Sequence, residues 1–118
     1  MNKTSINYNG RKFRCVSNSE SGEVNEETVF EYHHEGDIVW AEYHGGEIVR
    51  GQLIARCADD GSLDMRYQHI NRRGELMTGI CRSTPQLLPD RRIRLHEKWQ
   101  WTSGDRSSGE SLIEEIRD

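Results

Sequence analysis

The stretch that decides the fold is GQLIARCADDGSLDMRYQHINRRGELMTG, residues 51–79. Apolar and polar side chains alternate along it, which indicates β-strands, and two short loops that end in glycine interrupt the alternation. A three-residue hairpin loop with glycine in last place fixes the register of the strands that it joins. This register predicts the following partners on one face: Cys57 with Leu63, Ala55 with Met65, Leu53 with Tyr67, Gly51 with His69, His69 with Met77, Tyr67 with Gly79, and Met65 with Cys81.

The opposite face of the same strands carries mixed, mostly polar side chains. Its predicted partners are Arg56 with Asp64, Ile54 with Arg66, and Gln52 with Gln68. Charge pairs and amides suit a surface that is in contact with water. The stretch therefore predicts a sheet with one apolar face and one solvated face.

The same alternation, broken by turn residues, runs through the rest of the chain. It predicts nine strands, at residues 6–8, 11–18, 28–33, 37–44, 47–58, 62–71, 75–83, 91–102 and 110–116. The last segment also has the spacing of one short helix over residues 111–117, but a strand is favoured. Segments 17–27 and 103–109 are polar, so we expect solvated loops there.

Two further turns determine how residues 37–44 are expected to lie. A three-residue loop at residues 34–36 and a two-residue turn at Gly45-Gly46 place Trp40 and Glu42 on the apolar face. The partners that follow are Tyr32 with Ile38, Phe30 with Trp40, Ile38 with Leu53, Trp40 with Gly51, and Glu42 with Val49. An aromatic ring then lies opposite each in-strand glycine, Gly51 and Gly79, which favours a sharply bent sheet.

A sheet with one apolar face needs a second layer or has to close on itself. The hydrophobic fraction is only 33%, and adding the 11 glycines still leaves it below the roughly 45–50% that is typical of globular chains. The sequence therefore predicts an all-β fold, a single-domain antiparallel up-and-down β-barrel of about eight or nine strands over residues 1–118. This strand pattern is similar to that of calycin-like barrels such as lipocalins and fatty-acid-binding proteins.

Charge and composition exclude several classes of partner. The formal net charge of −4 argues against a nucleic-acid partner, because such binders need a basic surface. No apolar run is long enough to span a membrane, and residues 1–7 lack the apolar stretch of a signal peptide, so a cytoplasmic location without a membrane partner is expected. The three cysteines, Cys15, Cys57 and Cys81, have no CxxC spacing and are predicted to be reduced and buried.

The predicted interior contains aromatic rings together with a few polar groups. The candidate ligand-binding residues are Trp40, Glu42, Met65, Tyr67, His69, Glu97, Trp99 and Trp101. A buried carboxylate needs a partner, water or a ligand. The favoured hypothesis is a non-catalytic binding module for a small, partly apolar ligand, which Glu42, His69 or Glu97 would orient.

Two other functions stay open at this point. The interior polar groups can instead form a hydrogen-bonded plug, in which case the protein is a structural or protein-interaction module whose outer residues Ile54, Leu76 and Ile80 contact another chain. The last possibility is an enzyme that uses an interior carboxylate with His69 as acid and base.

No metal or cofactor is predicted. Neighbouring residues of a strand point to opposite faces, so His33 and His34 are not expected to chelate one ion. No glycine-rich loop leads from a strand into a helix, which argues against nucleotide cofactors bound in that way.

Five stretches resemble a family of small bacterial proteins that carry the automatic name N-acetylglutamate synthase. They are VNEET (24–28), AEYHGGEI (41–48), LDMRY (63–67), GELMTGIC (74–81) and EKWQWTSGD (97–105), within a resemblance that spans residues 8–116. The resemblance implies a bacterial cytosolic protein and assigns no catalytic residue. Its name suggests an acetyltransferase, but such enzymes bind the cofactor's pyrophosphate at a strand-to-helix turn with an Arg/Gln-x-x-Gly-x-Gly/Ala pattern, and this chain lacks that pattern.

Overall fold

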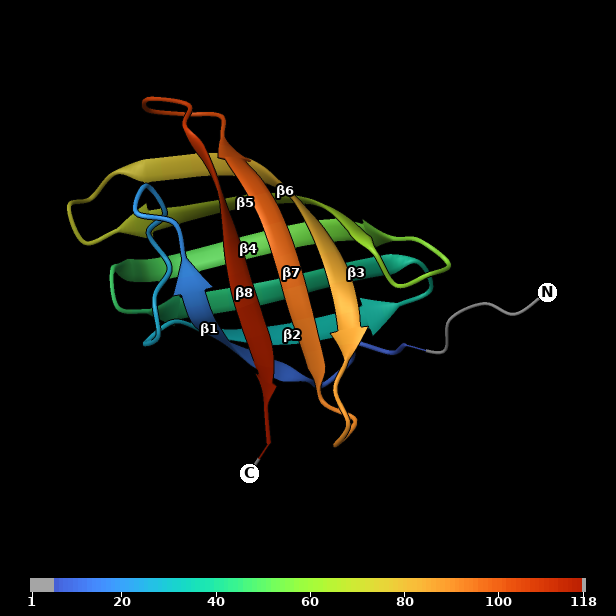
Figure 1. Ribbon diagram of the computed structural model, residues 1–118. Helices are drawn as coiled ribbons and strands as arrows, with labels where there is room; N and C mark the ends of the chain where they lie inside the picture. Colours follow the sequence, from blue (N-terminus) through green and yellow to red (C-terminus); the bar gives the residue numbers. More distant parts are fainter. Residues whose placement is uncertain (1–5, 118) are drawn as a thin grey trace.

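Eight strands form one closed barrel in which each strand pairs antiparallel with the next, and β8 closes the ring against β1 (Figure 1). The computed structural model describes residues 6–117. The strands are β1 (Lys12–Asn18), β2 (Val29–Glu35), β3 (Ile38–Gly45), β4 (Ile48–Cys57), β5 (Leu63–Asn71), β6 (Leu76–Leu87), β7 (Ile93–Trp101) and β8 (Ser108–Ile116). The predicted all-β, up-and-down barrel is therefore confirmed.

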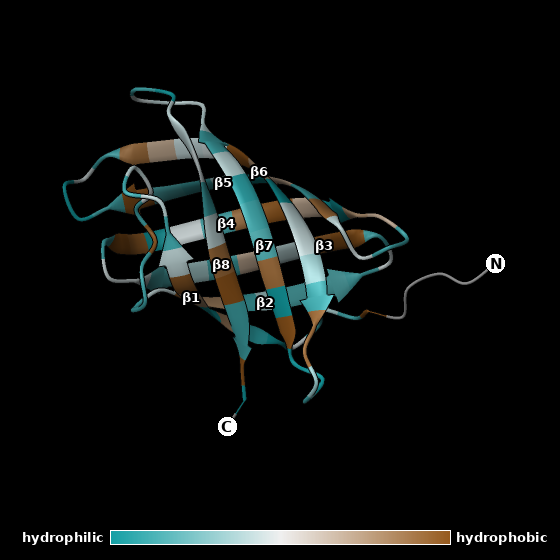
Figure 2. Ribbon diagram, in the orientation of Figure 1, coloured by the Kyte–Doolittle hydropathy of each residue, from teal (hydrophilic) through white to brown (hydrophobic). Residues whose placement is uncertain are grey.

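The interior of the barrel is built from every second residue of each strand. In β7, for example, every second residue is buried, from Ile93 through Glu97 to Trp101, whereas the residues that alternate with them face outward. Figure 2 shows the same alternation of hydrophobic and hydrophilic bands along the strands. Closure buries the apolar face of a single sheet against itself, which explains how a chain with few apolar residues forms a core.

One half of the barrel is filled by its own side chains and by the amino-terminal segment. Tyr8 is fully buried there, and its hydroxyl donates a hydrogen bond to the carbonyl oxygen of Gly61 at 2.6 Å. The Tyr32 ring packs on Phe13, with ring centroids 4.8 Å apart. Residues 6–8, predicted as a ninth strand, instead form this seal without strand pairing, so the prediction of a strand there is wrong.

The register of β4, β5 and β6 agrees with the sequence prediction at every pair derived above. Gly51 faces His69, Leu53 faces Tyr67, and Tyr67 faces Gly79. The outer pairs, such as Arg56 with Asp64, are also confirmed. The two glycine-ended loops thus set the register of this part of the barrel.

Strand β3 lies with the opposite face inward from the one predicted. Its buried residues are Val39, Ala41 and Tyr43, and Trp40 and Glu42 lie on the outer face. The cause is in both flanking turns: Glu35 pairs with Ile38 around a two-residue turn, and Gly45 pairs with Ile48 after a register shift. Each of the two turns reverses the face that points inward, so the reversals cancel across β3. Strands β2 and β4 keep their predicted inward faces, and only β3 is reversed.

The two ends of the chain also bear on earlier predictions. The last segment is strand β8, as favoured, and not a helix. Residues 1–5, which carry most of the signal-peptide prediction, lie outside the described residues. The described part of the chain contains no helix that is long and apolar enough to cross a membrane. The three cysteines are free, as predicted, with Cys15 and Cys81 buried and Cys57 half-buried.

Strand β1 differs from the other strands in how little it pairs with its neighbour β2. It pairs with β2 only over Lys12–Arg14, whereas it pairs with β8 along its whole length around a bulge near Val16. The chain between β1 and β2, residues 19–28, folds over the end of the barrel opposite Tyr8 (Figure 1). We call residues 19–28 the covering segment.

Aromatic rings lie directly on Gly51 of β4 and Gly79 of β6, so these positions exclude a side chain. A Cβ atom at Gly79 would collide with the ring and hydroxyl of Tyr67, and one at Gly51 would collide with the Tyr43 ring. The ring predicted over Gly79 is therefore confirmed, and the ring over Gly51 belongs to Tyr43 and not to Trp40. The substitution Gly79→Ala is expected to lower the free energy of unfolding by about 1–3 kcal/mol, measured by urea denaturation.

A double-mutant cycle separates this collision from a general effect of alanine in the strand. In a Tyr67→Leu background the cost of Gly79→Ala should fall, because the smaller side chain leaves room for the new methyl group. Equal costs in both backgrounds would contradict the collision.

Candidate ligand cavity under the covering segment

The half of the barrel opposite Tyr8 contains a cavity of about 50 Å³. That volume holds a few water molecules, at roughly 10–15 Å³ for each. The wall is mainly apolar and comes from all eight strands and the covering segment. Its residues are Asn18, Gly22, Glu23, Val24, Phe30, Tyr43, Leu53, Met65, Tyr67, His69, Cys81, Glu97, Trp99, Trp101 and Ser111.

Five aromatic side chains form most of the wall. Phe30 stacks on Tyr43 with ring centroids 4.9 Å apart, and Trp101 lies 5.7 Å from Tyr67 and 5.6 Å from Trp99. Such tilted and offset ring pairs add to the stability gained by burial. The rings therefore hold one another in place around the cavity.

Glu97 is a buried carboxylate of this wall, and no cationic partner for it is found among residues 6–117. Its two oxygens accept hydrogen bonds from the hydroxyls of Ser83, at 3.0 Å, and Ser111, at 2.9 Å. Burial raises the pKa of Glu97 to about 7, against the lowering effect of the two serine hydroxyls. The carboxyl group is thus harder to ionise than that of a glutamate in water.

Hydrogen bonds from the two tryptophans of the cavity wall hold the covering segment and the end of β1 beside it. The indole N–H of Trp101 donates to the carbonyl oxygen of Ser21 at 2.9 Å, and that of Trp99 donates to Asn18 Oδ1 at 3.1 Å. The two ends of the segment are anchored as well, since Ser19 N donates to the Glu110 carbonyl and the Thr28 hydroxyl donates to the Gly45 carbonyl.

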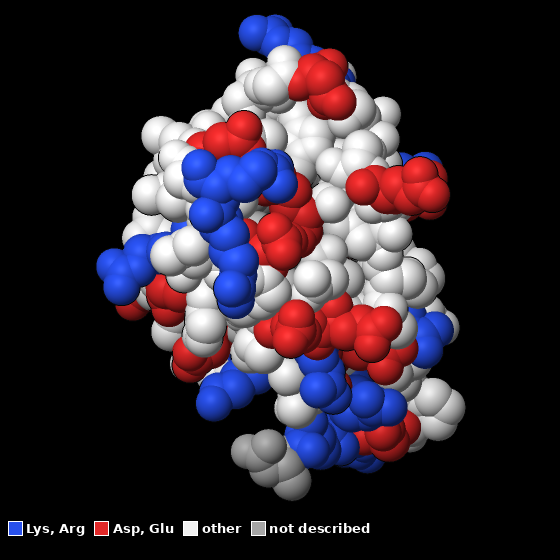
Figure 3. Space-filling model, turned by 90° about the vertical axis from the view of Figure 1, so that its left-hand side faces the viewer, with Lys and Arg blue, Asp and Glu red and all other residues white. Residues whose placement is uncertain are grey.

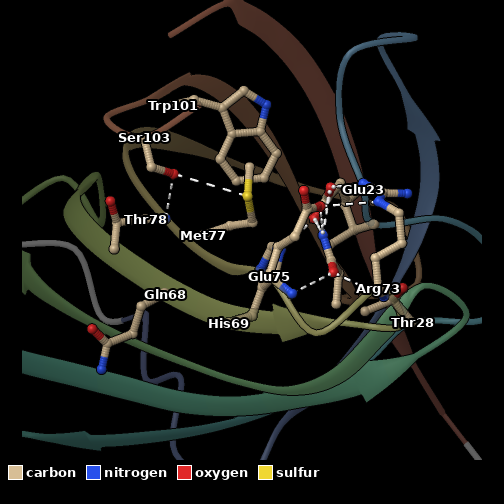
Figure 4. A network of polar contacts seen from close by, with 12 residues as sticks. Glu23, Thr28, Gln68, His69, Arg73, Glu75, Met77, Thr78, Trp101 and Ser103 are labelled. Atoms are coloured by element: carbon tan, nitrogen blue, oxygen red, sulfur yellow. Dashed lines mark hydrogen bonds and ion pairs between the residues drawn. The ribbon is translucent and has the colours of Figure 1, made fainter. Parts of the chain in front are cut away.

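Glu23, in the middle of the covering segment, inserts its carboxylate into the mouth of the barrel (Figure 4). Its oxygens lie 2.8 Å from His69 Nε2, 3.1 Å from Asn71 Nδ2 and 3.1 Å from Arg73 Nη2. The His69 side chain is only 1% exposed, whereas that of Arg73 is 63% exposed. Glu23 therefore joins a buried imidazole to a guanidinium group at the surface.

The protonation state of His69 follows from its two partners. Its Nδ1 lies 2.9 Å from the hydroxyl oxygen of Tyr43, which can donate to it, while Nε2–H donates to Glu23. The neutral ring satisfies both contacts, and burial lowers the pKa of His69 despite the neighbouring Glu23 carboxylate. His69 is thus a neutral hydrogen-bonding residue of the wall.

The charged groups at this end of the barrel lie mainly outside the cavity. Figure 3 faces this end and shows recessed acidic side chains beside a run of basic ones. Arg73 also pairs with Glu75, at 2.9 Å, on the surface. No group of three or more metal-ligating side chains is found among residues 6–117.

Six of the eight predicted ligand-binding residues line this one cavity. They are Met65, Tyr67, His69, Glu97, Trp99 and Trp101. The interior placement predicted for Trp40 and Glu42 is wrong: on the outer face, Trp40 stacks on the ring of His33, and Glu42 pairs with the same histidine at 2.8 Å. The structure also joins His69 to Glu23 and not to Glu97, so the predicted acid–base pair is not assembled.

Sequence reasoning missed two parts of the site. Phe30 and Tyr43 were absent from the candidates, although Tyr43 would have appeared once β3 was turned over. Asn18, Gly22, Glu23 and Val24 lie in or beside the segment that was predicted to be a solvated loop. No local pattern marks Glu23 as inward-facing, because its partners are about 50 residues away in the chain.

The comparison with known families agrees with this geometry. The sequence signature of the family described as "Avidin-like protein" matches residues 6–116. The chain belongs to the avidin-like family. No curated protein and no solved structure matches the chain.

Membership of the avidin-like family confirms the resemblance to calycin-like barrels. Avidin-like proteins typically bind small ligands, which fits an interior cavity at one end of the barrel. Neither this match nor the helix-free fold supports the acetyltransferase that the automatic name suggests.

The buried Glu97 makes a prediction about stability and pH. Because its pKa rises from about 4.5 to about 7 on folding, the stability that it contributes is present below pH 4.5 and is lost as the pH rises through 7. The whole change is worth roughly 3 kcal/mol. Relative to wild type, Glu97→Gln should therefore gain stability between pH 4.5 and pH 8, as measured by denaturant unfolding at each pH.

Wild type and variant share every other titratable group, so the difference between their stability curves isolates Glu97. Parallel curves over this pH range would show that Glu97 ionises in the folded protein as it does in the unfolded chain.

Proposed function

We propose that this avidin-like barrel is a binding protein that takes up a small, partly apolar molecule in the cavity between Trp101, Tyr43 and Glu97. One observation carries the proposal. Half of the barrel interior is filled by packed side chains around Tyr8, but the other half contains a cavity of about 50 Å³ walled by aromatic rings. Ligand sites are commonly concave and mostly apolar, with a few polar groups that orient the ligand.

The covering segment is the part that would have to move for a larger ligand. A volume of about 50 Å³ accommodates only a few non-hydrogen atoms, so a larger molecule would displace the Glu23 side chain from the mouth. At the barrel mouth the covering segment is held by hydrogen bonds to Trp101 and His69, which a ligand or water can replace. Its opening leaves the eight-stranded ring closed.

The family membership supports a small-molecule ligand and leaves its identity open. Biotin is therefore one compound to test, beside fatty acids, haem and aromatic metabolites. The cavity wall itself offers few polar groups, mainly Glu97, Glu23 and His69. A ligand that fits would bury an apolar body against the rings and use one or two hydrogen bonds.

The test is a ligand panel followed by thermal unfolding and tryptophan fluorescence. A bound ligand should raise Tm and change the fluorescence, because Trp99 and Trp101 line the cavity. Trp101→Leu should weaken binding at least tenfold, whereas Trp40→Leu, on the outer face, should leave affinity unchanged.

Two outcomes would argue against ligand binding in this cavity. One is a panel without any effect on Tm or fluorescence. The other is equal affinity in wild type and Trp101→Leu, which would place the ligand outside the cavity.

A second candidate function, contact with another chain, is favoured by one row of side chains on the outer face. The register places Trp40, Ile54, Arg66 and Ile80 side by side across β3 to β6, and Ile54 is 58% exposed. Light scattering is expected to give twice the mass of one chain for wild type and a lower mass for Ile54→Lys. Leu87→Lys, which alters an exposed leucine on β6 at the Tyr8 end, serves as the control. A wild-type monomer at all concentrations would argue against self-association.

A further inference from the structure

On the basis of the proposed function, we further propose that the ligand is a small organic cation with N–H groups, such as an ammonium or amidinium compound, whose charge pairs with Glu97. The inference joins three observations. They are the sign of the charges around the cavity, the free hydrogen-bonding capacity of Glu97, and the aromatic rings that surround the carboxylate.

The formal charges in the cavity wall are all negative. Glu23 and Glu97 belong to the wall, and the described lining residues include no lysine or arginine. His69 is neutral, for the reasons given above. The Arg73 guanidinium neutralises Glu23 from outside the cavity, which leaves Glu97 as the uncompensated carboxylate.

Glu97 has acceptor capacity that the protein does not use. An ionised carboxylate offers about four lone-pair sites, and the hydroxyls of Ser83 and Ser111 occupy one on each oxygen. Among residues 6–117, no ion pair of Glu97 is found. Burial of a carboxylate without a countercharge is costly. A cation that pairs with Glu97 in the cavity offsets part of this cost.

The aromatic wall suits the same ligand. Cations are attracted to the faces of tryptophan and tyrosine rings, and Trp99, Trp101 and Tyr67 pack together beside the cavity. The indole N–H groups of both tryptophans already donate to Asn18 and Ser21, so they are not available to a ligand acceptor while the covering segment is closed. A ligand carboxylate would find few donors and would meet the like charge of Glu97.

The experiment measures affinity for three ligands that differ only in the charge of one group. Propylamine, 1-propanol and propionate form one series, and benzylamine, benzyl alcohol and benzoate form a larger one that requires displacement of Glu23. Isothermal titration at pH 8 should show the amine binding at least tenfold more tightly than the alcohol in one series, with no binding of the carboxylate. Amine affinity should fall about tenfold from pH 8 to pH 6 as Glu97 takes up its proton.

Two variants assign the effect to Glu97. Glu97→Gln keeps the shape of the side chain and should remove both the preference for the amine and its pH dependence. Glu42→Gln removes a carboxylate from the outer face and should bind the amine as wild type does. The wild-type comparison of amine with alcohol tests the inference even if Glu97→Gln does not fold.

The outcomes separate this inference from the proposed function. Equal or tighter binding of the alcohol or the carboxylate, or full amine affinity in Glu97→Gln, would overturn the cationic ligand and leave a binding cavity in place. No binding of either amine would also overturn it, while the wider panel with biotin, fatty acids and haem decides the proposed function independently.

Discussion

The structure depends on one constraint: a single sheet has to enclose its own apolar face. The chain has too few apolar residues to build a second layer, so its eight strands curl until β8 meets β1. A sharply curved sheet needs positions without a side chain, and Gly51 and Gly79, under the Tyr43 and Tyr67 rings, are two such positions. Closure then sets the width of the interior, because the diameter of a barrel depends on its number of strands. Side chains either fill this interior or leave part of it open.

The two halves of this interior differ in how completely side chains fill them. Around Tyr8, large side chains fill the space, and the amino-terminal segment seals the end. At the other end, the inward residues are flat rings and polar groups, and the covering segment supplies the last wall. Predictions from the sequence left open whether the barrel is plugged or hollow. The structure contains both, one in each half.

Neighbouring strands differ in how well the sequence predicts their register. Strands β4 to β6 were placed correctly because their glycine-ended loops are short and their strands alternate strictly. The turn before β3 is one residue shorter than predicted, and the register shifts at the turn after it; with a side-chain period of two this is enough to turn Trp40 and Glu42 outward. The wall residues of β5 and β7 were therefore predictable. Glu23 was not, because its inward position depends on His69 and Arg73, which only the closed barrel brings near. The cytoplasmic location stays a prediction.

The short pairing between β1 and β2 has a consequence for the kinetics of ligand exchange. These strands are joined only over Lys12–Arg14, and the covering segment is the chain that connects them. The pairing of β1 with β2, which we call the seam, is thus continuous in the chain with the covering segment. The proposed ligand would then leave by movement of the covering segment beside this seam, with the ring of eight strands closed and at a small fraction of the free energy needed to unfold the barrel.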